Sequence, residues 1–457
     1  IQILNTINKQ KTILMGCRSK RKNINKINRN SYLISITIIF FLMIVSISFS
    51  RNSGYLNLEV VVNDDPYPAN IFVHTTRSYP RYMAVIDTLI EPVWFINSAH
   101  LGLDFKVNQN SLSYFDGLNN SWIILNEYMS EIDTLECVNG YYADFHDLQL
   151  LDDGGYILQA YDSITVDLSG ITPGGLTDAV VITLIIQEFD SNKNLIFEWD
   201  AWDYLNIANY QHLNLADNFV NWMHGNSIHV DLDSNILISN RRSSEVIKID
   251  RYSGQVIWIF GGPNNEFDIT NDPYNGFSRQ HDVRRIDNGN ILVFDNGNDH
   301  EPPISRALEY ELNEDQKTAD LVWEFSHPNE YVGNAMGSVQ RLPNNNTLIN
   351  WGRLIGQGGG FTEVDYDKNI VLDIQYPDTV HSYRVTKSNW NFDTNLISGD
   401  TNLDNIVDII DLSLIANYSN QEQSSLDVFH LFRFDINKDR HVNDDDIHLL
   451  AQIIIGL

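Results

Sequence analysis

The chain has only two cysteines among its 457 residues, Cys17 and Cys137. A disulfide framework is therefore excluded as the main source of stability, and a large apolar core must hold the fold. Hydrophobic residues make up 43% of the chain and aromatic residues 11%, which suffices for one large domain and a smaller one. We expect Cys137 to be a buried, small apolar residue.

Basic residues are scarce beyond the first 51 positions. Nine of the 30 lysines and arginines lie within that segment, where no acidic residue occurs. The remainder carries 21 basic against 60 acidic residues, a balance that repels nucleic acid and excludes it as a partner. Such an acidic body suits a cation-rich exterior and can itself bind Ca²⁺.

Long apolar runs are also absent, with one exception between Leu33 and Phe49. A basic stretch precedes this run, and Ser48 and Ser50 supply the small residues that signal peptidase reads. We predict that residues 1–50 are an N-terminal extension with a signal peptide, and that the protein is exported to the periplasm, the cell surface or the medium. The alternative is an uncleaved signal anchor, which would keep the protein at a membrane.

Residues 55–390 show little helical periodicity, and short apolar stretches alternate there with Asn, Asp, Gly and Pro. This pattern predicts an all-β domain. A unit with a polar or His-led entry, a strand, an Asp/Asn/Gly turn and a second strand recurs about six times. His281 lies 57 residues from both His224 and Ser338. We therefore predict a β-propeller of about six blades, which leaves few exposed sheet edges; two packed β-sandwiches are the alternative.

Three histidines, His146, His224 and His281, enter their units at the same phase of the repeat. A lone histidine is usually a packed or surface residue, but a propeller would bring these three to one end of its central channel. Several arginines lie near them in the sequence. In so acidic a domain this grouping predicts a bound anion, and salt bridges to outer carboxylates are the alternative for each arginine.

Two calcium-loop patterns lie within residues 398–457. Oxygen-bearing side chains recur at loop positions 1, 3, 5, 9 and 12, and an apolar residue stands at position 8. Each loop leads into an apolar, helix-like run, so we predict a small α-helical domain with two Ca²⁺ sites. The predicted ligands are Asp400, Asn402, Asp404, Ile406, Asp408 and Asp411 in the first loop, and Asp435, Asn437, Asp439, His441, Asn443 and Asp446 in the second.

These loops resemble those of the dockerin type I module, which carries two loop-helix repeats and docks onto a cohesin domain. Both loops end in Asp rather than in the Glu of an EF-hand, which agrees with that module. The resemblance implies a cohesin-type partner. It also implies that the residues just inside each helix face this partner, which here are Leu412-Ser413 and Ile447-His448.

Phrases of the large domain resemble the bacterial arylsulfotransferase (aryl sulfate sulfotransferase) family. They include Ala143-Asp-Phe-His146-Asp, Trp222-Met-His224-Gly-Asn, Gln280-His281-Asp-Val, Ser305-Arg306-Ala-Leu and Met336-Gly-Ser-Val-Gln-Arg. The resemblance implies a six-bladed propeller enzyme of the exported compartment, which moves a sulfuryl group from a phenolic sulfate donor to a phenol acceptor without a nucleotide cofactor.

The same resemblance implies a channel histidine that acts as nucleophile and passes through a sulfohistidine. A neutral imidazole can carry such a group, and cationic donors can stabilise the charge of an in-line transfer. By motif, the resemblance assigns His224 and His281 to sulfate binding or acid-base chemistry, and Arg306 to clamping the anion.

The implied nucleophile has no match at its expected place in the chain. The unit after His281 should supply it, but residues 334–360 contain no histidine. His381, in the phrase His381-Ser-Tyr-Arg384, is the predicted replacement. The alternative is a non-catalytic propeller that binds a sulfated or phenolic ligand and is displayed on a scaffold through the dockerin.

Overall fold

The computed structural model describes residues 58–77, 81–98, 100–390, 398–402, 406–419, 433–437 and 441–456. The predicted N-terminal extension and signal, residues 1–50, lies outside these ranges, so export stays a prediction. Within the described part of the chain, no helix is long and apolar enough to cross a membrane.

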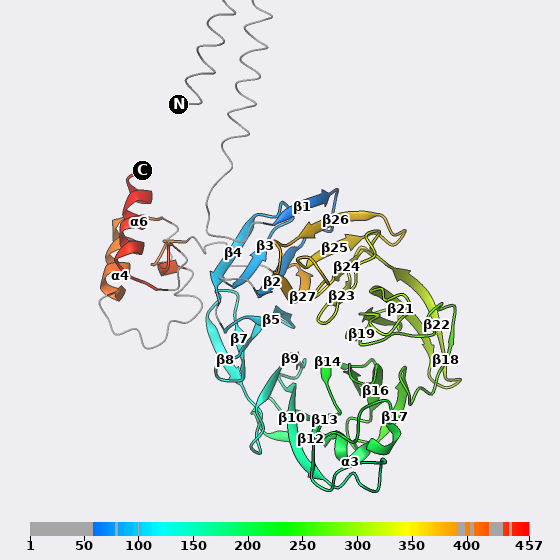
Figure 1. Ribbon diagram of the computed structural model, residues 1–457. Helices are drawn as coiled ribbons and strands as arrows, with labels where there is room; N and C mark the ends of the chain where they lie inside the picture. The colour runs from blue at the N-terminus through cyan, green and yellow to red at the C-terminus, as the bar shows by residue number, and fades with distance from the viewer. Residues whose placement is uncertain are drawn as a thin grey trace, which may run out of the picture. The chain divides into compact units, whose positions relative to one another are not determined.

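The large domain consists of six sheets arranged in a ring, as Figure 1 shows. Each sheet is one blade of a β-propeller with mostly antiparallel strands. This confirms the six-bladed, all-β prediction and excludes paired sandwiches. Three blades carry a fifth strand, which lies on the outer side of the blade.

Each blade begins with the strand nearest the axis of the ring. Blade 1 contains β27 (His381–Ser388), β2 (Asn70–Thr76), β3 (Tyr82–Ile86) and β4 (Pro92–Asn97). Blade 2 contains β5 (Leu103–Asn108), β6 (Ser111–Asp116), β7 (Ser121–Leu125) and β8 (Glu131–Leu135). Blade 3 contains β9 (Ala143–Leu150), β10 (Tyr156–Val166), β11 (Ala179–Phe189), β12 (Leu195–Asp200) and β13 (Phe219–Asn221), with α3 (Ala201–Tyr204) and the 3₁₀ turn η1 (Ile207–Asn209) between the last two.

The other three blades follow the same plan. Blade 4 contains β14 (Gly225–Val230), β15 (Ile236–Asn240), β16 (Glu245–Ile249) and β17 (Val256–Phe260). Blade 5 contains β19 (His281–Arg285), β20 (Ile291–Asp295), β21 (Arg306–Asn313), β22 (Thr318–Phe325) and β18 (Asp268–Thr270). Blade 6 contains β23 (Ser338–Arg341), β24 (Thr347–Asn350), β25 (Gly360–Val364), β26 (Ile370–Gln375) and β1 (Glu59–Asn63).

Backbone pairing between the two ends of the domain closes the ring. β27, from the end of the domain, pairs antiparallel with β2 from its beginning, and Phe72 lies opposite Thr386. β1 likewise joins the outer edge of blade 6 by pairing with β26. Ladder hydrogen bonds therefore tie the ends together, and the one cysteine among the described residues, Cys137, is a free thiol.

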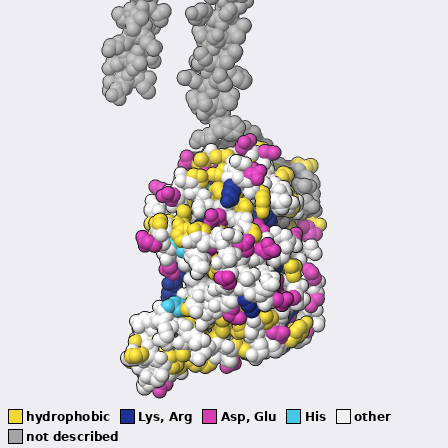
Figure 2. Space-filling model, turned by 90° about the vertical axis from the view of Figure 1, so that its right-hand side faces the viewer, with side chains coloured by type: hydrophobic (Ala, Val, Ile, Leu, Met, Phe, Trp, Pro, Cys, Tyr) yellow, Lys and Arg dark blue, Asp and Glu magenta, His cyan; other side chains and the backbone are white. Residues whose placement is uncertain are grey.

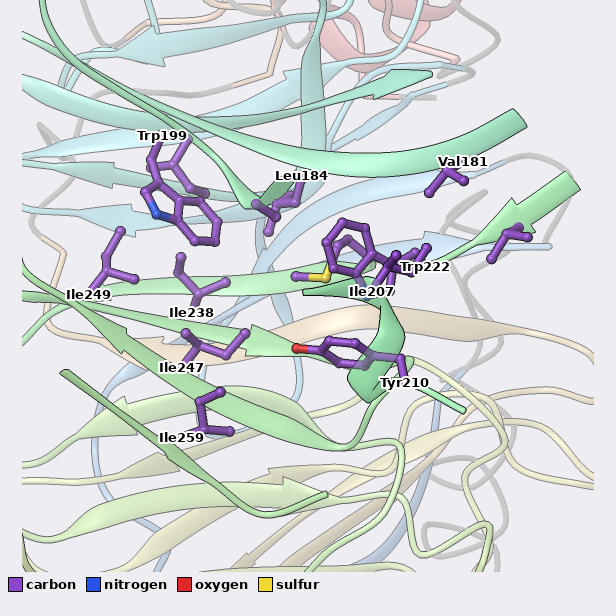
Figure 3. Close-up of a cluster of buried hydrophobic side chains, with 14 of the residues drawn as sticks. Val181, Leu184, Trp199, Ile207, Tyr210, Trp222, Ile238, Ile247, Ile249 and Ile259 are labelled. Atoms are coloured by element: carbon purple, nitrogen blue, oxygen red, sulfur yellow. The ribbon is translucent and has the colours of Figure 1, made fainter. Parts of the chain in front are cut away.

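Six apolar clusters lie between neighbouring blades and form the core. Figure 3 shows the cluster between blades 3 and 4, where Trp199 and Leu184 face Ile238 and Ile247. Burying one large apolar side chain contributes about 1.5–3 kcal/mol. Every blade contributes a buried tryptophan, namely Trp94, Trp122, Trp199, Trp258, Trp323 and Trp351, and Trp222 is buried with Trp199 in the cluster between blades 3 and 4.

The surface carries the excess of negative charge. Figure 2 shows Asp and Glu side chains spread over the face that it presents, with few Lys and Arg among them. Cys137 is a free thiol that packs beside the cluster between blades 2 and 3 and is partly, rather than fully, buried. Burial raises its pKa to about 12, with a smaller contribution from Asp144. This thiol is therefore a poor nucleophile.

The C-terminal region contains α4 (Ile409–Ser419) and α6 (Asp444–Ile454), which contact each other. Ile415, Phe434, Val442 and Leu450 form their shared apolar cluster. This confirms a small helical domain after the propeller. Asn443 caps α6, because its side chain accepts a hydrogen bond from the backbone N–H of Asp445.

Candidate active site in the propeller channel

β-Bulges near the start of the inner strands position the polar side chains of the channel. The pairing register shifts there in β5, β9, β14, β19 and β27. A bulge adds residues to one strand and redirects its side chains. The shift in β9 is the largest of these. The step from Ala143 to Leu148 covers five residues of β9, whereas the paired step in β10 covers two.

The bulges bring three histidines together with a tyrosine. The ring centroids of His146 and His224 are 4.7 Å apart. The ring of Tyr383, from β27, lies 5.6 Å from that of His146 and 6.5 Å from that of His281. The blade-entry histidines of blades 3, 4 and 5 thus meet at one end of the channel, as the repeat phase predicts.

Tyr161, Phe145 and Tyr383 add aromatic surface around these histidines. The ring of Tyr161 lies 6.3 Å from that of His224, and Phe145 stacks on His146 at 4.0 Å. Burial raises the pKa of Tyr383 well above its ordinary value, so its hydroxyl stays protonated. Such a surface suits the ring of a phenol.

His281 is held as a neutral imidazole with both nitrogens engaged. Its Nδ1 lies 2.6 Å from Asn296 Oδ1, and its Nε2 accepts a hydrogen bond from the backbone N–H of Met336 at 3.2 Å. The amide of Asn296 donates to the carbonyl of Gly333, so its Oδ1 must be the acceptor for Nδ1–H. Burial, followed by the charge of Arg241, lowers the pKa of His281 well below its ordinary value.

His224 is also neutral near pH 7, but its ring is less enclosed than that of His281. Burial lowers its pKa to about 3, and the neighbouring His146 and Arg241 add to the effect. Its backbone N–H donates to Asn240 Oδ1 at 2.9 Å, which fixes the start of β14. A weakly basic imidazole such as this one can donate to, or accept from, a ligand without carrying charge.

His146 has a carboxylate partner. Asp144 Oδ1 contacts His146 Nδ1, and the same oxygen accepts from the backbone N–H of His146 and from the amide of Gln159 at 2.8 Å. Although burial alone would raise it, the pKa of Asp144 is lowered, chiefly by His146. Asp144 is thus an ionised acceptor, and in the neutral form of the His146 ring this contact favours the tautomer with the proton on Nδ1 and the lone pair on Nε2.

Arg241 supplies a positive charge near His224 and His281, whose pKa values it helps to lower. One of its Nη atoms donates to the carbonyl of Asn334 at 2.9 Å, and its buried Nε has no hydrogen-bond partner. Among the described residues, no carboxylate lies within ion-pair distance of it. Burial and the neighbouring Arg279 lower its pKa to about 10, so it stays cationic.

A cavity of about 330 Å³ opens on Arg241. Its lining combines the guanidinium groups of Arg241 and Arg279 with the apolar side chains of Pro303, Val332 and Ile355. A cation beside apolar walls fits an anion that carries a hydrophobic group.

A network of buried ion pairs lies in the channel next to the histidines. Its carboxylates come from the residues that directly follow His146 and His281 in the inner strands. Asp147 follows His146 and binds Lys106 Nζ at 2.5 Å and Arg284 Nη2 at 2.8 Å. Asp282 follows His281 and binds Arg284 at 2.8 Å and Arg384 at 3.0 Å. Although burial opposes it, these cations lower the pKa of Asp147. The network ties four blades together beneath the histidines.

The structure does not place the other two predicted catalytic residues in this group. Arg306 is fully committed, since its nitrogens bind Asp295, Asp272, Glu324 and the carbonyl of Gly276. An arginine held in this way is structural, so the geometry does not favour it as an anion clamp.

His381 starts β27 and is buried apart from the other three histidines. No ring contact joins it to them in the described chain, and its Nδ1 is buried without a hydrogen-bond partner. Burial, then Arg77 and Arg353, lowers its pKa. Tyr383, two residues later, occupies the channel instead.

The sequence interpretation missed Asp144, Tyr161 and Tyr383 as members of the site. Asp144 lies two residues before His146, and this short spacing was a usable signal. The two tyrosines gave no such signal, because their approach depends on the bulges in β9 and β27 and on ring closure.

The calcium loops have the same geometry in both copies. Asp411 Oδ1 accepts from the backbone N–H of Thr401 at 2.7 Å, and Asp446 Oδ1 accepts from that of Ile436 at 2.7 Å. Each carboxylate also accepts an N–H from the far side of its loop, at Asp408 and Asn443. The last residue of each predicted loop thus closes it.

The loops offer hard oxygen donors, which suit Ca²⁺. The carboxylates of Asp400, Asp411, Asp435 and Asp446 are all buried. Burying this much negative charge in two short loops fits a divalent cation. In the described ranges no three acidic, His or Cys side chains converge as a metal site, and Asp404 and Asp439, one predicted ligand of each loop, lie outside those ranges.

Leu412 and Ile447, implied to face the cohesin, pack against the apolar cluster of the small domain. Their neighbours Ser413 and His448 are exposed. The second residue of each pair is therefore the more accessible one, since Leu412 and Ile447 are partly buried.

Comparison with known proteins agrees with this fold. The family model for arylsulfotransferase (ASST) matches residues 52–384, and the chain belongs to this family. The model for the dockerin type I domain matches residues 398–455, so the small domain is a dockerin. Dockerins of this type generally bind calcium and imply a cohesin partner, and domains of both families are typically extracellular or periplasmic. No curated protein matches the chain.

Several solved structures share a distant likeness. A protein of unknown function from Bacteroides caccae is 12% identical, with a TM-score of 0.43 over 70% of this chain and 99% of its own. The β-propeller domain of Cps50 (Swd1) from Myceliophthora thermophila is 9% identical, with a TM-score of 0.39 over 70% and 90%. Virginiamycin B lyase from Staphylococcus aureus is 10% identical, with a TM-score of 0.33 over 71% and 89%. These similarities carry no functional argument.

Proposed function

We propose that the protein is an exported arylsulfotransferase that moves a sulfuryl group between phenolic compounds through a histidine intermediate. The observation that carries this proposal is the grouping of three histidines at one end of the channel, with Arg241, which has no carboxylate partner in the described chain, near enough to lower the pKa values of His224 and His281. An acidic protein that keeps one such cation unpaired next to a cavity offers an anion site there.

The parts of the site divide the chemistry between them. Arg241 and His224 bind the oxygens of the sulfate group and stabilise the charge that spreads over them during transfer. His281, with both nitrogens engaged, keeps the channel wall in place. Tyr161, Phe145 and Tyr383 contact the phenol ring. None of these roles calls for a nucleotide cofactor.

The dockerin fixes the enzyme to a scaffold. We propose that its two loops each hold one Ca²⁺, with the twelve ligands predicted from the sequence, and that a cohesin domain on a cell surface or secreted scaffold binds it. Export would follow from the N-terminal segment. The acidic surface suits this calcium-containing exterior.

The test is an assay of sulfuryl transfer from 4-nitrophenyl sulfate to phenol, in which the released 4-nitrophenol is measured. We expect turnover that requires both donor and acceptor and that falls strongly in Arg241→Ala. The matched control is Arg242→Ala, which changes the adjacent arginine. Absence of turnover in the wild-type protein across several phenol acceptors would contradict the proposal.

One observation favours a second function, a non-catalytic propeller that binds a sulfated phenol. Gly337 and Ser338 stand where blade 6 would present the histidine of the family, so the usual nucleophile is missing. In that case 4-nitrophenyl sulfate would bind in a calorimeter, with loss of binding in Arg241→Ala, but no 4-nitrophenol would be released.

A further inference from the structure

We infer that His146, oriented by Asp144, is the nucleophile that accepts the sulfuryl group in this protein. The inference rests on the proposed function. It assigns a role that neither the family resemblance nor the repeat pattern gave to this histidine, and five observations carry it.

Blade 6 has no room for a histidine at its entry. Ser338 pairs with Asn350 as His281 pairs with Phe294 one blade earlier. Ser338 is buried, and its hydroxyl donates to the carbonyl of Val385. The preceding Gly337 has φ +111°, and a Cβ there would lie 2.2 Å from Phe294 Cε1. A side chain at this glycine would be strained and would clash.

Two of the other histidines are unsuited to attack. Both nitrogens of His281 already have partners in Asn296 and the backbone of Met336, and its side chain is 3% exposed. His381 makes no ring contact with the site in the described chain. Neither can present a free lone pair to a group bound at Arg241.

His224 lies in the site but has no orienting carboxylate among the described residues. Its low basicity also weakens it as a nucleophile, because nucleophilic strength falls with the affinity for a proton. It is better placed to contact the sulfate oxygens.

His146 has the arrangement that the chemistry needs. The contact between Asp144 and Nδ1 fixes the tautomer with the proton on Nδ1, so the lone pair resides on Nε2. Asp144 is itself held by Gln159 and by the backbone of His146. The large bulge between Ala143 and Leu148 sets both side chains into the channel, and the ring of His146 lies 4.7 Å from that of His224.

The transfer balances in two steps. In the first, Nε2 of His146 attacks the sulfur, the N–S bond forms, the aryl O–S bond breaks, and the phenolate leaves with that bonding pair. The ring becomes positively charged and Asp144 stabilises it. In the second, the acceptor phenol attacks the sulfur, the N–S bond breaks, and the phenol proton passes through solvent to the released phenolate.

The experiment is peptide mapping of the wild-type full chain after mixing with 4-nitrophenyl sulfate without acceptor and quenching under basic conditions. We expect one SO₃ unit on the peptide that contains His146, and its removal when phenol is added before the quench. An SO₃ unit on His381, His224 or any other histidine overturns the inference but keeps the proposed function, whereas an SO₃ unit on another type of residue overturns both. No modification and no turnover in the wild type overturn both.

Variants supply a second readout. We expect His146→Ala to lose at least about 10³-fold in kcat, with partial recovery on addition of imidazole. Asp144 is a positioning residue, so Asp144→Asn should lower kcat by on the order of 10³-fold with little change in KM, because the amide favours the wrong tautomer. His100→Ala, a half-exposed histidine in a loop, is the matched control and should keep wild-type rates. Wild-type turnover in a folded His146→Ala protein would refute the assignment.

Discussion

The hydroxyl of Tyr383 donates a hydrogen bond to the backbone carbonyl of Asn226 at 3.1 Å, across the channel from β27 to β14. These residues are 157 positions apart in the sequence. The same tyrosine ring lies between His146 and His281. The strand that closes the ring therefore also forms a wall of the candidate site.

This relationship predicts different outcomes for two substitutions of Tyr383. Tyr383→Phe removes only the hydrogen bond and should lower the free energy of unfolding by about 1 kcal/mol, with activity largely kept. Tyr383→Ala removes the ring as well and should cost about 3–5 kcal/mol and most of the activity. Urea unfolding and the sulfuryl transfer assay measure the two effects, and Tyr252→Phe at an exposed tyrosine is the control. Equal loss of activity in both variants would contradict a role for the ring.

The ion network beneath the histidines should be far more sensitive to mutation than a surface ion pair. Asp147→Ala leaves Lys106 and Arg284 with one carboxylate fewer in a buried site, so we expect a loss of about 3 kcal/mol or more. The pair of Lys193 and Asp133 is exposed, and Lys193→Ala should cost less than about 1 kcal/mol. Denaturant unfolding compares the two, and similar losses would show that the network adds no stability.

Acidification should destabilise the propeller before its carboxylates titrate. The pKa values of His224 and His74 are lowered to about 3 and that of His229 to about 4, all chiefly by burial. An unfolded histidine titrates near 6.5. Between about pH 3 and pH 6.5 the unfolded chain therefore binds more protons than the folded one. The contribution of these histidines to the free energy of unfolding is complete above pH 6.5 and is lost as pH falls toward 3.

Thermal unfolding between pH 7.5 and pH 4 measures this effect. We expect Tm to fall steadily across the range, and we expect His74→Leu to flatten the slope. A Tm that stays constant or rises on acidification would contradict the burial of neutral histidines.

Calcium should stabilise the small domain and leave the propeller unchanged. We expect two Ca²⁺ per full chain by titration calorimetry, and one in either Asp411→Ala or Asp446→Ala, because each carboxylate closes one loop. Asp445→Ala, an exposed position on α6, is the matched control and should keep two. Chelator should expose residues 398–455 to protease. A chain that binds no Ca²⁺, or that resists protease equally in chelator, would contradict the loop assignment.

Much of the architecture was predictable because it depends on local signals. The turn residues and the 57-residue spacing of His224, His281 and Ser338 predict repeated blades, and the oxygen-bearing loop positions predict the dockerin. His146, His224 and His281 occur at the same phase of the repeat, each near the start of an inner strand. This phase predicts that all three lie at the same end of the channel.

The composition of the site was less predictable because it depends on contacts between blades. Arg306 has the sequence context of an anion clamp, yet Asp295 and Asp272 reach it only through the pairing of β20 with β21 and a loop from outside that pair. His381 lies in the right strand, but the bulge in β27 turns Tyr383 into the channel. Arg306 and Arg241 differ in whether the fold brings carboxylates within ion-pair distance, which the residue type alone does not reveal.

The most direct test of the proposed transfer is a stopped-flow measurement of 4-nitrophenol release from 4-nitrophenyl sulfate in the absence of any acceptor. A covalent histidine intermediate predicts a rapid burst of about one equivalent of 4-nitrophenol per chain, followed by little further release until phenol is added. If no burst occurs without acceptor, but 4-nitrophenol is released as soon as donor and phenol are both present, the covalent intermediate is contradicted. No release under either condition would contradict the transferase.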